Sequence, residues 1–375
     1  MAHYFLFPEK DSTIYSNPLR QTLNTGIDEI LTLSDEDYFG KKYPSRILLQ
    51  FKTTEIKDTI NNKVNGNNFS ASLKLYETEH FNLSTNQYLE VYPLAEGPWN
   101  NGTGRYENRP ATSNGVSWDF KDNSTDQTAW TTSGYGTGIT GSWTASAAGG
   151  GSWYTGSGFE VNRTYGYNEN FDISLDVTSP ITKFYSSSQF SSTYPNGITN
   201  NGFILKRSAS QEFDNIDNGT LNFFSMDTHT IYPPYLDISW DDSSYSTGSG
   251  TVLTSGDIYV TLRNNKQEYR NIEERTFRLN VRPLYPTRKF VTTSNFLDVN
   301  YFTSESYYSL LDYATEETII PFDNHTKLSA DSEGMYFKLY MNGLEPGRYY
   351  KLLFKHENND GITVYDEDCY FKVIE

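Results

Sequence analysis

The sequence predicts an all-β protein built from β-sandwiches, and three observations support this. Aromatic residues are abundant, with 30 Tyr, 23 Phe and 6 Trp among 375 residues, and such side chains fit the pleated, half-buried surface of a sheet. The 27 Gly and 14 Pro residues supply the frequent turns that short strands need. The chain also shows almost no run with the apolar spacing of a long amphipathic helix.

Short runs of alternating or wholly apolar residues predict strands along most of the chain. Those in the first two thirds of the chain are residues 28–33, 45–51, 71–76, 89–94, 171–178, 202–206, 221–224 and 235–240. Those toward the C-terminus are residues 258–262, 276–281, 335–340, 349–354 and 369–373. Residues 304–312 are the one helix-like piece and predict a single short helical element between strands.

Two stretches interrupt this pattern. Residues 100–167 contain Gly-, Ser- and Thr-rich runs with several Trp, and so long a stretch without clear elements is usually functional or flexible. We interpret it as an elaborated loop, called the insertion below. Residues 241–250, rich in Asp, Ser and Gly, are the best linker candidate. The prediction is therefore one domain at residues 1–244 and a second at residues 245–375.

The first domain resembles a DNRLRE-type jelly-roll module. Its opening strands are matched by residues 11–16, 24–31, 45–51 and 71–76, and its closing strands by residues 176–178, 201–206 and 234–238. The resemblance implies a jelly-roll β-sandwich. Within it, the triplet Asn24-Thr25-Gly26 can supply a left-handed turn position, and Arg46 can extend its charged end from a strand terminus to water.

The second domain is similar to immunoglobulin-like or fibronectin-like sandwiches. The similarity lies in residues 342–352, where a Leu-x-Pro-Gly turn precedes a Tyr-bearing strand, and in residues 364–373. As a whole the chain resembles virion structural proteins of marine contractile-tailed phages, through residues 223–232, 240–244 and 282–286. That resemblance implies a non-enzymatic neck, tail or baseplate component, made in the host cytoplasm and located in the virion.

Charge and composition limit the partners. The net charge of −17 repels phosphate backbones and anionic lipid, so neither nucleic acid nor a membrane is an expected partner. No apolar run is long enough to cross a bilayer, and the N-terminal residues lack the pattern of a secretory signal. The expected partners are other virion proteins and further copies of the same chain. The lone Cys369 is expected to be a buried core thiol.

Acidic residues offer candidate chemistry, but no catalytic motif supports it. Asp241-Asp242 is a carboxylate pair, and Asp227 lies near His229, yet a hydrolase needs two carboxylates at a defined separation. A structural Ca²⁺ is an open alternative, with oxygens from residues 35–37 or from Asp214 and Asp217. Solvated acidic loops are favoured over a calcium site, because no fixed ligand spacing is present, and no cofactor is expected.

Six aromatic residues in and beside the insertion are the candidate site residues: Trp99, Trp118, Trp130, Trp143, Trp153 and Tyr154. They are interpreted as anchors of a protein interface, where Trp and Tyr carry much of the binding energy. Two alternatives remain open for each of them, stacking on sugars and packing in the core. Glycan stacking would make the chain a carbohydrate-binding module or a receptor-binding protein, and a glycoside-cleaving tail enzyme is a third hypothesis.

Overall fold

The computed structural model describes residues 2–84, 86–124, 127–130, 149–185, 197–263, 265–287 and 298–375. It confirms the all-β fold class. The chain divides into two compact units. The larger unit comprises Leu6–Lys63 and Ser70–Asp237, and the smaller unit comprises Met1–Phe5, Val64–Phe69 and Ile238–Glu375. Each unit is described separately below.

The larger unit contains two main sheets. The larger sheet has the order β11-β8-β13-β5-β2, with β4 paired to β5, and its strands are β11 (Val161–Gly166), β8 (Asn86–Pro93), β13 (Phe203–Arg207), β5 (Lys41–Phe51), β2 (Pro8–Tyr15) and β4 (Asp35–Tyr38). The three-stranded sheet has the order β3-β14-β7, formed by β3 (Ile30–Leu33), β14 (Thr220–Phe224) and β7 (Glu77–Phe81). Shorter pairs are β6 (Phe69–Leu75) with β12 (Ile173–Asp176) and β9 (Phe120–Asp122) with β10 (Thr128–Ala129).

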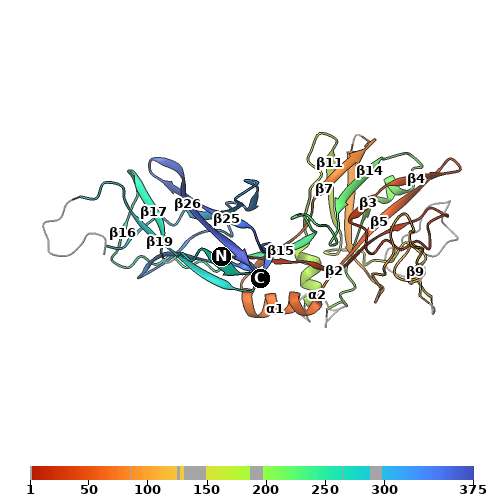
Figure 1. Cartoon of the computed structure of the whole chain (residues 1–375), viewed down its shortest axis with the longest axis horizontal. Helices are drawn as coiled ribbons and strands as arrows, with labels where there is room; N and C mark the ends of the chain where they lie inside the picture. Colours follow the sequence, from red (N-terminus) through yellow and green to blue (C-terminus); the bar gives the residue numbers. More distant parts are fainter. Residues whose placement is uncertain are drawn as a thin grey trace. The chain divides into compact units, whose positions relative to one another are not determined.

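The helices of the described residues are short. They are α1 (Thr53–Asp58), the π-helix η1 (Thr59–Val64), α2 (Thr178–Tyr185), α3 (Ala209–Glu212) and the 3-10 helix η3 (Met341–Gly343). In the larger unit, α1 and α2 lie side by side (Figure 1). The ring of Phe184 on α2 lies 5.3 Å from Phe203 of β13, so α2 packs its apolar side on the large sheet. Strands β1 (Ala2–Leu6) and β15 (Tyr235–Trp240) run across the division between the units.

The smaller unit is a β-sandwich. One sheet has the order β16-β20-β19-β24-β23 with β17 paired to β19, and its strands are β16 (Thr251–Val252), β20 (Asn300–Tyr301), β19 (Glu274–Pro283), β24 (Gly334–Tyr340), β23 (Ser329–Asp331) and β17 (Ile258–Arg263). The other has the order β18-β26-β25-β21-β22, formed by β18 (Glu268–Arg270), β26 (Gly361–Ile374), β25 (Tyr349–Asn358), β21 (Ser306–Asp312) and β22 (Thr318–Ile320). Aromatic rings join the two sheets, because Phe337 of β24 lies 4.3 Å from Tyr308 of β21.

One predicted element is wrong, and one boundary differs. Of residues 304–312, Ser306–Asp312 form β21 and not a helix. The strand was missed because nearly every one of its side chains is buried, so the run lacks the alternation that marks a half-buried strand. The compact units divide at Asp237, and the smaller one includes the N-terminal residues 1–5. The continuous domains 1–244 and 245–375, and the jelly-roll and immunoglobulin-like topologies, stay predictions. Cys369 is buried and forms no disulfide, as the sequence predicts.

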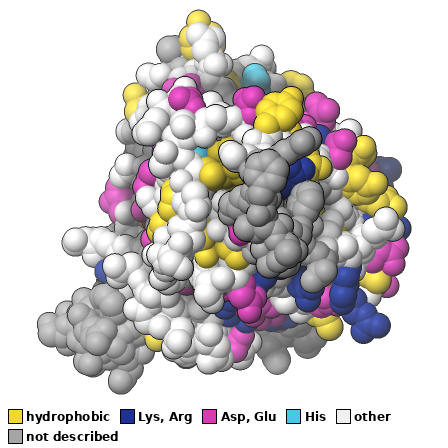
Figure 2. Space-filling view, turned by 90° about the vertical axis from the view of Figure 1, so that its left-hand side faces the viewer, with side chains coloured by type: hydrophobic (Ala, Val, Ile, Leu, Met, Phe, Trp, Pro, Cys, Tyr) yellow, Lys and Arg dark blue, Asp and Glu magenta, His cyan; other side chains and the backbone are white. Residues whose placement is uncertain are grey.

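The surface carries charges of both signs. Figure 2 shows one face of the molecule, on which acidic side chains are scattered among neutral polar ones and Lys and Arg form only small groups. Hydrophobic side chains on this face occur in separate patches. Among the helices of the described residues, none combines the length and apolarity needed to cross a membrane.

Candidate interaction site

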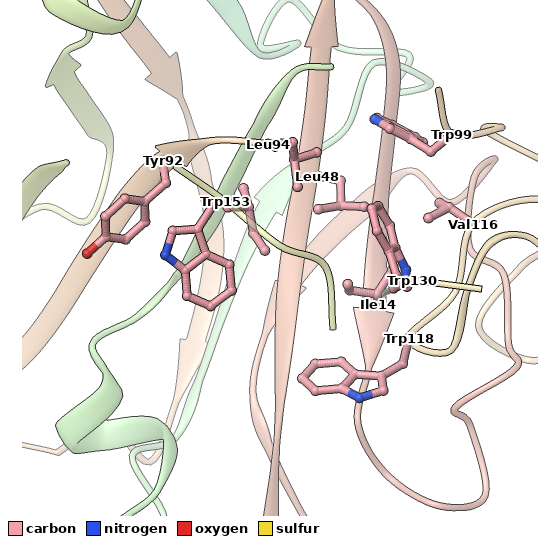
Figure 3. Close-up of a cluster of buried hydrophobic side chains, with 10 residues drawn as sticks. Ile14, Leu48, Tyr92, Leu94, Trp99, Val116, Trp118, Trp130 and Trp153 are labelled. Carbon is pink, nitrogen blue, oxygen red and sulfur yellow. The ribbon is translucent and has the colours of Figure 1, made fainter. Parts of the chain in front are cut away.

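Four of the predicted site residues lie together in the core of the larger unit (Figure 3). The exposed fractions of their side chains are 2% for Trp99, 1% for Trp118, 1% for Trp130 and 7% for Trp153. Two of the indole N–H groups donate to backbone oxygens, from Trp99 to Asn201 at 2.8 Å and from Trp130 to Ser117 at 3.0 Å. A buried Trp needs a hydrogen-bond partner for its N–H group, and these two rings find one inside the core.

These four Trp residues are too buried to anchor an interface, so that interpretation is wrong for them and the core-packing alternative describes them. The surrounding Gly and Ser residues indicate a loop, but that loop folds back over the sheet and buries its rings. Tyr154 is half-buried and stacks on Phe159 with ring centroids 5.2 Å apart. Trp143 lies outside the described residues.

The Trp core also encloses a buried ion pair. Arg46 is fully buried, donates to the Glu212 carboxylate at 2.8 and 2.7 Å, and donates to the Gly150 carbonyl at 2.7 Å. Its guanidinium lies 4.7 Å from the ring centroid of Trp118 and 5.2 Å from that of Trp153. The prediction that Arg46 reaches water is wrong, because paired hydrogen bonds and ring faces replace its hydration.

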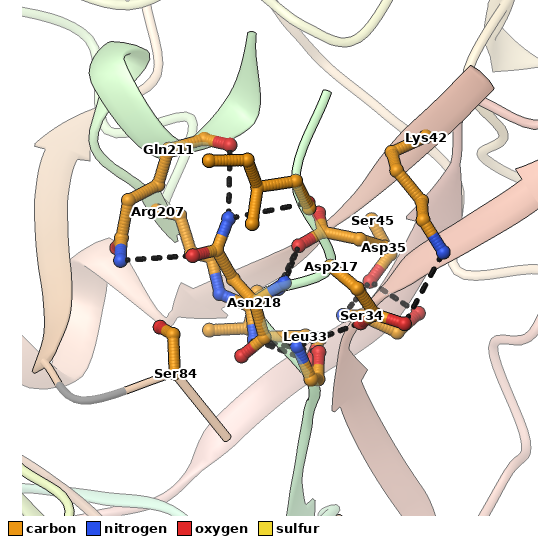
Figure 4. Close-up of polar contacts among 12 residues, drawn as sticks. Leu33, Ser34, Asp35, Lys42, Ser45, Ser84, Arg207, Gln211, Asp217 and Asn218 are labelled. Carbon is orange, nitrogen blue, oxygen red and sulfur yellow. Dashed lines mark hydrogen bonds and ion pairs between the residues drawn. The ribbon is translucent and has the colours of Figure 1, made fainter. Parts of the chain in front are cut away.

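A second buried charge, Arg207 of β13, lies in a cluster of polar contacts (Figure 4). Arg207 donates to Asp35 at 3.0 Å, to Gln87 at 3.0 Å and to the Gly219 carbonyl at 2.8 Å. Burial raises the pKa of Asp35 to about 6, although Arg207 and the Asn218 N–H oppose this rise. The cluster is satisfied internally, so it stabilises the fold and does not present a reactive group.

The carboxylates considered for calcium are held by protein donors. Asp35 binds Arg207, Asp217 binds Lys42 at 3.2 Å, and Asp214 accepts the Ile216 N–H at 2.8 Å. In the part of the chain that the structure describes, no group of three His, Cys, Asp or Glu side chains has a metal-binding arrangement. These acids therefore act as structural partners of basic and backbone donors.

Asp227 lies near a second carboxylate that the sequence analysis missed. Asp11 is 1% exposed and accepts the Met226 N–H at 2.6 Å. Burial raises the pKa of Asp11 to about 7, and the nearby Asp227 charge adds to the rise. His229 is exposed, and Asp241 caps the Ser243 N–H at 2.8 Å. Neither acidic segment named in the sequence analysis brings two carboxylates across a described cleft.

The larger unit contains a groove of about 960 Å³, called the insertion groove. It is formed by a turn after β2, by β4 and by the first part of the insertion. Its lining residues are Asn17, Leu19, Arg20, Thr22, Leu23, Asp37, Tyr38, Tyr106, Glu107, Asn108, Arg109, Thr112, Ser113 and Asn123. Amides, hydroxyls and charges of both signs dominate this lining, which suits hydrogen bonding to a polar partner.

The triplet Asn24-Thr25-Gly26 holds the insertion in place beside the groove. The buried Asn24 side chain donates to the Asn101 and Val116 carbonyls at 2.7 and 2.8 Å and accepts the Gly104 N–H at 2.8 Å. The predicted left-handed turn is wrong, because Gly26 has no positive φ. Glycine is needed here because a Cβ would collide with the Asn101 carbonyl.

One wall of the groove is fixed by an ion pair and an aromatic ring. Arg20 pairs with Glu36, and its guanidinium lies 4.3 Å from the ring centroid of Tyr106. The Tyr106 hydroxyl donates to Glu36 at 2.9 Å. Burial and the Glu36 charge raise the pKa of Tyr106 to about 12, so the phenol stays neutral at ordinary pH. This wall is therefore rigid before any partner binds.

A hairpin beside the groove presents an exposed aromatic ring. Phe39 and Gly40 form the two-residue loop between β4 and β5, with φ angles of 53° and 72°. Such loops favour Asn, Asp or Gly, because a positive φ is unfavourable for other residues. Phe39 is nevertheless 88% exposed, and its ring contacts Tyr38 of the groove at 4.5 Å. Leu19, also in the lining, is 74% exposed.

The sequence analysis located the insertion, but four of the six aromatic residues that it named there are buried. Trp is conspicuous in a Gly-rich segment, whereas Leu19, Phe39 and Tyr106 stand in stretches without a periodic pattern. One local signal was present, since Phe39-Gly40 occupies a turn-prone stretch between two strands. An aromatic residue directly before Gly in a hairpin loop lies at the end of the sheet and away from the core, so it indicates exposure.

Comparisons with known proteins give no family for this chain. No protein-family model matches it, and no curated protein matches it. It is similar to the crystal structure of a DUF4785 family protein from Legionella pneumophila subsp. pneumophila str. Philadelphia 1, with 9% sequence identity and a TM-score of 0.20. The alignment covers 98% of this chain and 66% of that chain. At this TM-score the likeness carries no argument about fold or function.

Proposed function

We propose that the chain is a non-enzymatic structural component of a tailed-phage virion, in its neck, tail or baseplate. It binds neighbouring virion proteins through the insertion groove and the Phe39 hairpin, and several copies assemble in each particle. The proposed partners include neither nucleic acid nor a membrane. The proposal rests on the resemblance to virion proteins, on the all-β architecture and on the surface of the larger unit.

The observation that carries the proposal is the position of Phe39. A left-handed backbone costs an ordinary L-residue about 1–2 kcal/mol, and a ring that is 88% exposed, with an edge contact to Tyr38, recovers little of this in the folded chain. A residue that costs stability and packs so little is explained by binding. Aromatic anchors of this kind contribute disproportionately to protein interfaces. The adjacent groove supplies the polar rim that surrounds such anchors.

The direct test is mass spectrometry of virions purified from infected host cells. The chain is expected in every particle at a fixed ratio to the other structural proteins. Its absence from purified particles refutes the proposal. Particles assembled with the chain are also expected to show density for it in a reconstruction.

A substitution tests the surface separately from the fold. Phe39→Asn removes the ring but suits a positive φ, so we expect the unfolding free energy to stay unchanged or to rise by about 1 kcal/mol. Incorporation into particles is expected to fall strongly. Tyr167→Ser is the matched control, because Tyr167 is 59% exposed in the same unit and does not line the groove. Normal incorporation of the Phe39 variant assigns the interface to another surface.

A further inference from the structure

The smaller unit carries a group of three exposed tyrosines on the outer face of its five-stranded sheet. Tyr313 follows β21, Tyr349 begins β25 and Tyr370 lies on β26, and these residues are 50%, 47% and 42% exposed. The ring of Tyr370 lies 5.6 Å from that of Tyr313 and 6.4 Å from that of Tyr349. We call these three residues the tyrosine face.

The backbone fixes the positions of these rings. Strands β25 and β26 lie side by side (Figure 1), and Tyr349 pairs with Lys372 while Lys351 pairs with Tyr370. Tyr349 and Tyr370 are therefore diagonal neighbours on one face, within reach of each other. The Tyr313 N–H donates to the Tyr349 carbonyl at 2.9 Å, which ties the turn after β21 to the same face. The three rings are thus held by regular structure.

The rings do not serve the core. Alternation along β25 sends Tyr350, Leu352 and Phe354 into the sandwich, where they are 3% exposed or less. Tyr349 and Tyr370 point the other way. Three tyrosines on an outer face, with Tyr370 in contact with both of the other rings, bury apolar ring surface only partly, so the group remains able to bind a ligand.

A pocket of about 420 Å³ adjoins the tyrosine face. Its lining residues are Leu311, Asp312, Tyr313, Glu316, Lys351, Leu353 and Asp366. This volume lies in the lower part of the roughly 300–1,000 Å³ range of small-molecule sites. Asp312 is occupied, since it accepts Arg348 Nε at 2.6 Å and the Ala314 N–H at 2.9 Å. Glu316 and Asp366 are exposed carboxylates; Asp366 accepts a hydrogen bond from Lys351 Nζ at 2.7 Å, and the remaining lone pairs of both carboxylates can accept from a ligand.

We propose that the tyrosine face and its pocket bind a neutral oligosaccharide. Tyrosine rings provide apolar faces for the C–H surfaces of sugar rings, and the Glu316 and Asp366 carboxylates and the Lys351 ammonium provide partners for hydroxyl groups. The pocket holds three carboxylates and one ammonium, and the whole chain has a net charge of −17, so an anionic glycan is repelled. This binding does not depend on the proposed virion role.

The ring orientations specify the shape of the ligand. Tyr370 is inclined by 49° to Tyr313 and by 64° to Tyr349. Rings without a common plane cannot lie flat on a crystalline polysaccharide surface. Three inclined rings suit a single soluble chain whose successive sugar rings are rotated relative to one another.

The test uses the full chain and a panel of neutral homo-oligosaccharides of glucose, galactose, mannose and N-acetylglucosamine, with dextran sulfate as the anionic probe. Binding is measured by saturation-transfer NMR and by titration calorimetry. We expect one or more neutral probes to bind and dextran sulfate not to bind. Tyr370→Ala, which removes the ring that contacts both others, is expected to weaken binding by about tenfold or more. Tyr370→Phe keeps the ring and is expected to bind nearly as well.

The control is Tyr285→Ala, because Tyr285 is 83% exposed in the same unit and lies outside the pocket. It is expected to bind like the unchanged chain. The proposal is overturned if no neutral probe binds, if only dextran sulfate binds, or if the Tyr285 and Tyr370 variants lose affinity equally. Loss of association with a virion protein in the Tyr370 variant, without any glycan binding, identifies the face as a protein interface and also overturns it.

Discussion

The two units of this protein stabilise their interiors in different ways. The larger unit buries charged side chains, among them Arg46 and Arg207, and satisfies each with specific partners. The interior of the smaller unit is dominated by aromatic rings, and a pair such as Arg278 and Asp331 stays 29% and 37% exposed. The larger unit therefore depends on exact polar geometry and on the charge state of its acids. The smaller unit depends on ring packing, which tolerates changes at its surface.

The largest effect is expected when the central ion pair of the larger unit loses one partner. Glu212→Ala leaves the Arg46 guanidinium buried without its carboxylate, and breaking a buried pair costs about 3–5 kcal/mol. Urea unfolding followed by Trp fluorescence measures this loss. Hydrogen exchange is expected to speed up in the larger unit and to stay unchanged in the smaller one.

Two controls sharpen this result. Glu55→Ala removes an exposed pair with Lys52, where the side chains are 53% and 45% exposed, and is expected to cost under about 1 kcal/mol. The double variant Arg46→Met with Glu212→Leu removes both charges and is expected to be more stable than Glu212→Ala alone. Equal losses in the Glu212 and Glu55 variants would show that the larger unit does not depend on its buried pair.

The second effect is a pH dependence of the larger unit that comes from Asp11. Its folded pKa of about 7 exceeds the ordinary value of 3.8, so the folded state binds the proton more tightly than the unfolded chain. Stability is therefore fully present below about pH 4 and falls as the pH rises through 7. Asp35, with a pKa raised to about 6, contributes in the same direction.

The variant Asp11→Asn tests this directly. It keeps an oxygen that accepts the Met226 N–H but cannot ionise. We expect the thermal midpoint of the larger unit at pH 8 to rise by about 5 °C, which corresponds to roughly 2 kcal/mol for a unit of this size. At pH 5 the rise is expected to be smaller, because Asp11 is protonated in the folded state there and only the unfolded chain ionises. A variant that is destabilised equally at both pH values contradicts the buried neutral carboxyl.

The sequence predicted most strands but not the long-range polar contacts. Residues 349–354 alternate because β25 has one core face, and that local pattern is readable. Arg46 lies in a correctly predicted strand, yet its partner Glu212 is 166 positions away and no local signal connects them. The burial of the four Trp residues was not predicted for the same reason, since it depends on how the insertion folds back over the sheet. Phe39 was detectable in principle, because the turn and the aromatic residue are adjacent in sequence.

The smallest effect is expected in the smaller unit, with the opposite sign. His356 is fully buried, its Nε2 accepts the Thr303 N–H at 3.1 Å, and its ring lies 4.4 Å from Phe302. Burial lowers the pKa of His356 to about 4, so the folded state binds the proton more weakly than the unfolded chain. Stability of the smaller unit therefore falls as the pH drops below 6.5, by about 1 kcal/mol between pH 7 and pH 5.5.

His356→Gln keeps an acceptor for Thr303 and is expected to abolish this fall, as measured by hydrogen exchange of residues 349–358 at the two pH values. Because acidification then stabilises the larger unit and weakens the smaller one, peptides from the two units should change protection in opposite directions. A parallel change in both units would mean that their interiors do not differ in the way their buried groups indicate.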